Sequence, residues 1–312
     1  MKQVEDEKMR ENIEVMPVTP DLGRVLAPAP NSSDYSLPQA DSELIELFKN
    51  SGVLLFRGFE IDRPRFVAYT EALTPDFIDY SGGAYARDKI GGNATVLSVT
   101  GHRQFFAVPL HGEMFYTKHR PTILWFFCVA PPVEGGQTTV CDGVALLNQL
   151  SAETRALFEA QPINYIRHYE DGVWQKIYQS DDVARVEAIC RERDTEFSHH
   201  AEDNSISTQY RCSAITQPLY TDQPAFVNNI LPVMVQEANG HTHSLVRFAD
   251  GSKIPEDVIS ELKEVSERLT VEVNWQEGDL VMVDNSRLMH GRRAFDDTQR
   301  ELNMRMSATV FS

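Results

Sequence analysis

Two histidines and one glutamate, placed far apart along the chain, constrain its fold more than any other feature. His111 and Glu113 flank a single glycine, and His290 follows near the C-terminus. In a strand, side chains two positions apart share one face, so His111 and Glu113 can reach one metal ion from an extended segment. His290 completes such a site only if strands from both ends of the chain lie together, which predicts that they fold as one unit.

The segments around these residues are typical of strands. Residues 103–110 form an extended approach to His111, and Gly112 is expected to leave room beside the metal. Residues 280–283 are a short apolar run between turn-forming segments, which predicts a buried strand with His290 at its exit.

Apolar spacing along the rest of the chain predicts more strands than helices. Helices are expected over 41–50, 63–73, 143–150 and 256–269, and further strands over 53–56, 123–129, 270–275 and 300–312. This pattern favours an antiparallel β sandwich or barrel with helices at its periphery. Residues 1 to 15 are charged and form a predicted flexible tail, with a single domain over 16–312.

Two imidazoles and one carboxylate form the facial triad that holds Fe(II) and leaves coordination positions open. A His-x-Glu pair is common by chance, and a histidine near a strand end is more often structural, so spacing alone is weak support. The pairs His199 and His200 and His241 and His243 lie in polar segments and are set aside as metal ligands.

Four segments in order, 52–59, 110–116, 131–138 and 275–292, resemble the taurine dioxygenase/clavaminate synthase-like (TauD/TfdA) family of Fe(II)/2-oxoglutarate oxygenases. The resemblance implies a mainly β fold with a double-stranded β-helix core (jelly roll, cupin-like). It implies Fe(II), 2-oxoglutarate and O2 as cofactors, with ascorbate as the reductant in vitro. His111, Glu113 and His290 match the family's catalytic iron ligands, with Glu where many members have Asp.

The resemblance also implies residues that bind 2-oxoglutarate. Thr138 matches the threonine that hydrogen-bonds the co-substrate. Arg305 and Arg300 are both candidates for the arginine that pairs with its remote carboxylate, and the spacing after His290 favours Arg305. In an extended segment over 300–312 the two side chains point to opposite faces, so both cannot face inward without a bulge.

The implied reaction is oxidation of an unactivated C–H bond, with release of succinate and CO2. Hydroxylation is the expected outcome because Glu113 occupies the carboxylate position, while desaturation, epoxidation and cyclisation stay open. The motifs favour a small amino-acid-like substrate in specialised metabolite biosynthesis, free or tethered to a carrier protein. Two alternatives are a metal-dependent hydrolase with Glu113 as base and a non-catalytic jelly-roll protein that binds a metabolite.

Composition limits the partners. The formal net charge of −17 disfavours nucleic acid, although a local cluster could attract an acidic carrier protein. That cluster comprises Arg287, Arg292, Arg293, Arg300 and Arg305. Four cysteines without Cys-x-x-Cys spacing, no secretory signal and no long apolar run predict a cytoplasmic protein without a membrane segment, of open oligomeric state.

Two long segments, 80–92 and 183–207, are candidate lids because they are polar, interrupted by glycine or lack strand pattern. Aromatic residues beside the first motif are candidates to line a substrate pocket, although core positions are commoner for such residues. They are Phe105, Phe106, Phe115 and Tyr116.

Overall fold

The computed structural model describes residues 12–19, 22–78, 80, 82–83, 87–99, 105–308 and 311. The helices are α1 (Ser42–Ser51), α2 (Arg63–Leu73), α3 (Gly143–Gln149), α4 (Ala152–Ala160), α5 (Trp174–Tyr178), α6 (Val183–Glu192), α7 (Ile230–Ala238) and α8 (Glu256–Leu269). The strands are β1 (Ile13–Pro17), β2 (Arg24–Pro28), β3 (Val53–Phe56), β4 (Leu97–Ser98), β5 (Val108–His111), β6 (Ile123–Ala130), β7 (Thr138–Asp142), β8 (Ile163–Tyr169), β9 (Glu196–His200), β10 (Ser205–Cys212), β11 (Ile215–Thr216), β12 (Ala225–Phe226), β13 (Ser244–Phe248), β14 (Val271–Val273), β15 (Leu280–Asp284), β16 (Leu288–Arg292) and β17 (Glu301–Ser307).

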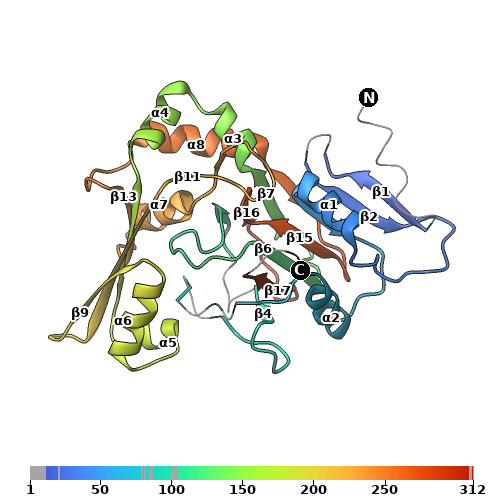
Figure 1. Ribbon diagram of the computed structural model, residues 1–312, viewed down its shortest axis with the longest axis horizontal. Coiled ribbons are helices and arrows are strands. Elements are labelled where there is room, and N and C mark those ends of the chain that lie inside the picture. Colours follow the sequence, from blue (N-terminus) through green and yellow to red (C-terminus); the bar gives the residue numbers. More distant parts are fainter. Residues whose placement is uncertain are drawn as a thin grey trace.

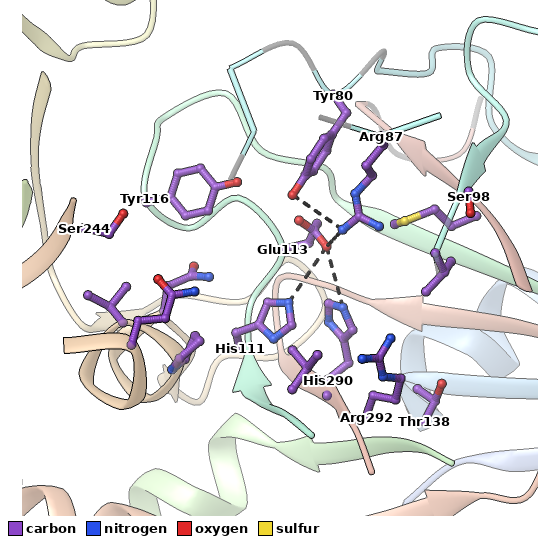
Figure 2. Close-up of a pocket in the computed structure, with 18 of the residues that line it drawn as sticks. Tyr80, Arg87, Ser98, His111, Glu113, Tyr116, Thr138, Ser244, His290 and Arg292 are labelled. Carbon is purple, nitrogen blue, oxygen red and sulfur yellow. Dashed lines mark hydrogen bonds and ion pairs between the residues drawn. The ribbon is translucent and has the colours of Figure 1, made fainter. Parts of the chain in front are cut away.

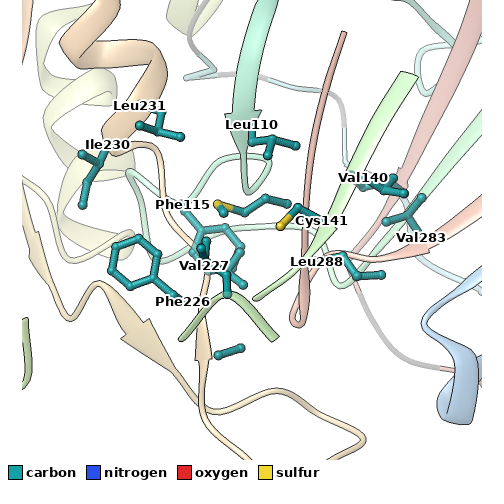
Figure 3. Packing of buried hydrophobic residues seen from close by; sticks show 14 of the residues in the cluster. Leu110, Phe115, Val140, Cys141, Phe226, Val227, Ile230, Leu231, Val283 and Leu288 are labelled. Atoms are coloured by element: carbon teal, nitrogen blue, oxygen red, sulfur yellow. The ribbon is translucent and has the colours of Figure 1, made fainter. Parts of the chain in front are cut away.

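Two sheets build the core. The major sheet has the order β1-β2-β3-β15-β6-β17-β4, and the minor sheet has the order β14-β7-β16-β5. Neighbouring strands are antiparallel except for β2 and β3. Apolar side chains of both sheets meet in one cluster, in which Val283 of the major sheet accompanies Val140 and Leu288 of the minor one (Figure 3). This is the jelly-roll arrangement that the sequence predicted.

Strand β6 shows why the major sheet is buried on both faces. Its residues alternate between the cluster shared with the minor sheet, reached by Leu124 and Phe126, and a second cluster reached by Trp125 and Phe127. Helices α1 and α2 contribute to the second cluster and cover that outer face (Figure 1). A strand between two apolar layers needs side chains that are apolar on both faces. The continuous apolar run of residues 123–129 therefore predicted this strand.

A third sheet, of order β13-β8-β10-β9, was not predicted from the sequence. We call it the flanking sheet. It carries α5 and α6 on one side, where Trp174, Val186 and Ile206 form a separate apolar cluster. The prediction of a lid over 183–207 is wrong, because this segment forms α6, β9 and the start of β10. His199 and His200 lie in β9 and not in a loop.

The predicted boundary after residue 15 falls inside a strand. β1 begins at Ile13 and pairs with β2 from Ile13 to Pro17, so ordered structure starts before the predicted end of the tail. Residues 1–11 and parts of the candidate lid over 80–92 lie outside the described residues. All four cysteines are free thiols. Within the described ranges, no helix combines the length and the apolar character needed to cross a bilayer.

Candidate active site

The three predicted ligands meet where β5 and β16 run side by side in the minor sheet. His290 is the register partner of His111, and the centroids of their rings lie 4.3 Å apart. The Glu113 Oε2 atom lies 3.7 Å from His290 Nε2 and 4.0 Å from His111 Nε2 (Figure 2). One ligand atom from each residue lies within 4.8 Å of the others, so the triad can enclose one ion.

The backbone reaches this geometry differently from the prediction. β5 ends at His111, so Glu113 lies in the following turn and not in the strand. His290 lies inside β16, because the chain turns after β15 and crosses from the major to the minor sheet. Gly112 is required by packing: a Cβ there would stand 2.7 Å from Val227 and would also collide with the Phe115 ring. The predicted reason, room beside the metal, is therefore incorrect.

Hydrogen bonds hold the ligands in place. His111 Nδ1 lies 2.9 Å from the Pro109 carbonyl oxygen, which can only accept, so Nδ1 carries the proton and Nε2 offers its lone pair to the site. Buried Asn285 accepts from the Glu113 amide at 2.8 Å and donates to the Glu113 carbonyl at 3.1 Å. Sequence reasoning assigned Asn285 only to a turn, and no local signal predicts its contact with the distant ligand loop.

The electrostatics of the triad favour a cation. Burial lowers the pKa of His111 and lowers that of His290 well below the usual range, so both imidazoles are neutral and suited to coordination. Glu113 is buried, and the Arg87 guanidinium lies 3.4 Å from its Oε2. Two neutral imidazoles and one buried carboxylate are the donor set of a non-haem Fe(II) centre. The residues present fit that ion.

The triad borders a cavity of about 370 Å³. On one side of the triad the cavity is lined by Thr138 and Arg292 (Figure 2). Arg300 also lines the cavity and lies with Arg292 against the Phe295 ring. Trp275 Nε1 donates to Thr138 Oγ1 at 3.1 Å, and Arg300 Nε donates to the Gly136 carbonyl at 3.0 Å. These bonds orient side chains that the sequence assigned to the co-substrate.

The two arginines of this end lie close enough to influence each other. Burial lowers the pKa of Arg300 to about 9, with a further contribution from Arg292, and burial lowers that of Arg292 to about 10, with a smaller effect of Arg87. Both guanidiniums stay charged at neutral pH. A nearby anion would be stabilised by both charges.

Arg305 lies elsewhere, contrary to the preference stated from its spacing. On β17 the side chain of Met304 lines the cavity, so that of Arg305 points to the opposite face of the sheet. There it donates to the Val67 carbonyl, to Thr70 Oγ1 at 2.6 Å and to Glu71 Oε1 at 2.9 Å. The structure brings Arg300, and not Arg305, to the cavity.

The cavity wall opposite Thr138 contains Tyr116, which was a predicted pocket residue, and others that the sequence analysis did not single out. Figure 2 shows Tyr116 and Ser244 on this side of the triad. Arg167, on β8 of the flanking sheet, also lines the cavity, and its Cζ lies 3.4 Å from the Tyr116 ring centroid. His243, set aside above as a metal ligand, also lines the cavity and directly precedes β13 of this sheet. Arg167 and Ser244 come from the flanking sheet, whose position only the fold defines.

Most of the other residues predicted to serve the site lie away from the cavity. Of the four aromatic candidates, Tyr116 lines the cavity and Phe115 is a core residue, while Phe106 is 60 % exposed. The predicted arginine cluster is not a positive surface patch. Arg287 is paired with Asp142, and Arg293 is paired with Glu267 and Glu272, so no carrier-docking surface follows from them.

Fold and site together define a jelly-roll protein with a facial-triad metal centre. Residues 14–306 match the family described as taurine catabolism dioxygenase TauD, TfdA family. Since the match spans most of the chain, this protein belongs to the TauD/TfdA family. The predicted class, an Fe(II)/2-oxoglutarate-dependent oxygenase, and its cofactors are thereby confirmed.

Individual relatives are distant. The dapdiamide synthesis protein DdaC of Enterobacter agglomerans is 23 % identical over 306 residues, which is 92 % of each chain. A clavaminate synthase-like protein of Arabidopsis thaliana is 24 % identical over 83 % of this chain and 82 % of its own. The crystal structure of PvcB from Pseudomonas aeruginosa superposes with a TM-score of 0.62 at 18 % identity, over 94 % of this chain and 90 % of that one. These similarities confirm the jelly-roll fold.

Proposed function

We propose that this protein hydroxylates an unactivated C–H bond of a small amino-acid-like substrate in specialised metabolite biosynthesis. The observation that carries the proposal is the position of the triad. It borders a single cavity that has positively charged arginine side chains on both sides of the metal ligands. The group that contains Arg292 and Arg300 suits the dicarboxylate co-substrate. Arg167, on the opposite wall, faces the rest of the cavity. A cavity of about 370 Å³ suits a small molecule.

His111, Glu113 and His290 are proposed to hold Fe(II). With Fe(II), 2-oxoglutarate and O2 bound, such a centre couples decarboxylation of the co-substrate to succinate and CO2 with oxidation of a substrate C–H bond. The protein orients the ligands through Pro109 and Asn285 and limits the access of water by burying Glu113 and His290. A hydrolase with Glu113 as free base is disfavoured, because its carboxylate lies within the ligand set.

Thr138 and Arg300 are proposed to bind the remote carboxylate of 2-oxoglutarate. Arg300 replaces Arg305 in this role because it lines the cavity, and Arg292 adds a second positive charge beside it. A planar guanidinium can donate two parallel hydrogen bonds to a carboxylate. The depressed pKa of Arg300 supports the assignment, since an anion there would relieve the repulsion between two arginines.

The proposed pathway context rests on the relatives. DdaC takes part in dapdiamide synthesis, and PvcB is an Fe, alpha-ketoglutarate dependent oxygenase from an isonitrile synthetic pathway. We further propose that residues from 16, or from Ile13 with β1 included, to 312 form a single oxygenase domain. The largest apolar cluster supports this, because it joins residues of the major, minor and flanking sheets.

The first test is spectroscopic. Apoprotein is mixed with Fe(II) and 2-oxoglutarate under anaerobic conditions, and the weak visible charge-transfer band of the chelate is recorded. The band should appear in the wild type and be absent with Zn(II) or in His290→Ala, after which ascorbate and O2 are added and succinate release is measured with candidate amino acids. Absence of the band in folded wild-type protein would refute the assignment of the iron and co-substrate site and favour a hydrolase or a non-catalytic binding protein.

A further inference from the structure

Arg167 is a buried cation that the proposed iron and co-substrate chemistry does not use. It lies on β8, is 8 % exposed and lines the cavity beside Tyr116. Of the other cavity arginines discussed above, Arg87 is paired with Glu113, and Arg292 and Arg300 lie together at the end that contains Thr138. The cavity therefore has positive charge on two walls, contributed by different sheets.

Within the described part of the chain, the contacts of Arg167 do not include a counter-ion. Nη1 donates to the Tyr169 hydroxyl at 3.1 Å, and the guanidinium stacks on the Tyr116 ring. Among the described residues, no carboxylate lies within 4.0 Å of it, whereas Arg87 has Glu113 at 3.4 Å. An arginine stays protonated even when buried, and a buried charge is costly unless it is paired. An anionic ligand would supply the missing partner.

Ser244 adds a second donor at the same place. In the antiparallel pair of β8 and β13, Ser244 is the register partner of Arg167, so the two side chains share one face of the flanking sheet. Both line the cavity, and Figure 2 shows Ser244 across the triad from Arg292 and Thr138. A guanidinium next to a hydroxyl can donate several hydrogen bonds to one carboxylate.

We propose that Arg167 and Ser244 bind the carboxylate of the substrate, and thereby determine which of its C–H bonds faces the metal. The inference rests on the proposed oxygenase function and adds the group by which substrate is recognised. The enzyme should accept free carboxylic acids and discriminate against their amides, because an amide offers no negative charge to the buried guanidinium.

The test measures binding and needs neither iron nor turnover. Apoprotein is titrated by calorimetry with each of the common L-amino acids and with the corresponding primary amides. For at least one pair, the acid should bind at least about 10-fold more tightly than the amide, since hydrogen bonds to charged groups are strong. Arg167→Gln should abolish this discrimination, and Arg167→Lys, which keeps the charge without the planar fork, should reduce it.

Two further variants make the result specific. Arg211→Gln, on β10 of the same sheet with 56 % of its side chain exposed, should leave the discrimination unchanged. Arg300→Gln should also retain it, because the acid is expected at the opposite end of the cavity. If Arg167→Gln does not fold, Arg167→Lys and Ser244→Ala carry the test.

The proposal is overturned if every acid binds no better than its amide, if the folded Arg167 and Ser244 variants retain the preference, or if only Arg300→Gln loses it. The last result would place the bound acid in the co-substrate site. Because these titrations contain no Fe(II) or 2-oxoglutarate, their failure is distinct from a missing charge-transfer band, which would overturn the oxygenase assignment instead.

Discussion

Arg300 and Arg305 belong to the same stretch of chain but have different surroundings. Arg300 precedes β17 and borders the cavity, where burial and Arg292 lower its pKa to about 9. Arg305 is 2 % exposed and donates to groups of α2 and to Thr95 Oγ1 at 2.8 Å, with its Cζ 3.6 Å from the Phe77 ring centroid. The first arrangement suits a ligand, and the second suits a structural arginine that attaches α2 to the sheet.

Substitution of these arginines should therefore separate binding from stability. Arg300→Gln should weaken 2-oxoglutarate binding about 10- to 100-fold, because a charged hydrogen-bond partner of the carboxylate is lost. Arg305→Gln should lower the free energy of unfolding by about 3 kcal/mol, because it removes a buried guanidinium and leaves several of its hydrogen-bond acceptors unpaired. Titration of the charge-transfer band and denaturant unfolding measure the two effects. The reverse outcome, with 2-oxoglutarate affinity dependent on Arg305, would contradict our assignment.

Close packing between secondary-structure elements holds the metal-ligand residues in position. The turn after β5 brings Glu113 back beside His111, and Gly112 permits this because Phe115 and Val227 occupy the space that a side chain would need (Figure 3). The hydrogen bonds from Asn285 then attach this turn to the segment between β15 and β16. The triad thus depends on contacts among the turn after β5, the turn between β15 and β16, and the segment between β12 and α7.

Gly112→Ala should damage the site and the fold together. Overpacking at a rigid position costs about 1–3 kcal/mol, and displacement of the turn should weaken metal binding at least about 10-fold. The matched control is Gly172→Ala, which adds the same methyl group where nothing lies within 4 Å but where φ is +76°, so it carries a backbone cost without touching the triad. Metal affinity equal to wild type in Gly112→Ala would disprove the role given to this packing.

At the scale of the whole molecule, the metal links segments that are distant in sequence. His111 and Glu113 lie in the first half of the chain and His290 near its C-terminus, and the three residues meet at the minor sheet. A ligand that binds only the folded state stabilises it in proportion to its affinity. Metal and co-substrate should therefore act on the global unfolding transition and not only on the site.

Mn(II) with 2-oxoglutarate, used as an oxygen-stable substitute for Fe(II), should raise the thermal midpoint. At 100 times the dissociation constant the gain is about 2.7 kcal/mol, which corresponds to an increase in the midpoint of roughly 4 °C for a chain of 312 residues. A chelator should reverse the increase, and His290→Ala should show none of it. Calorimetry that finds the same midpoint with and without the metal would contradict the proposed site.

The sequence predicted the elements that lie between continuous apolar layers. Residues 53–56, 123–129 and 280–283 form β3, β6 and β15, and helices follow where 63–73 and 256–269 have helical spacing and capping or proline signals. The flanking sheet escaped prediction because its strands β8, β9 and β10 mix polar and apolar residues. In addition, the strands that pair with β8, which are β10 and β13, lie far along the chain. Local pattern carries no information on such pairing.

The sequence by itself determined the class of chemistry, because the identities of His111, Glu113 and His290 and the motifs around them fix the metal-binding donor set. Only the tertiary structure decided which arginine faces the cavity beside Thr138 and which residues line the opposite wall. Strand parity separates Arg300 from Arg305, and the direction of each face depends on which layer packs against it. Arg167 reaches the cavity through a sheet whose placement is a non-local property of the fold.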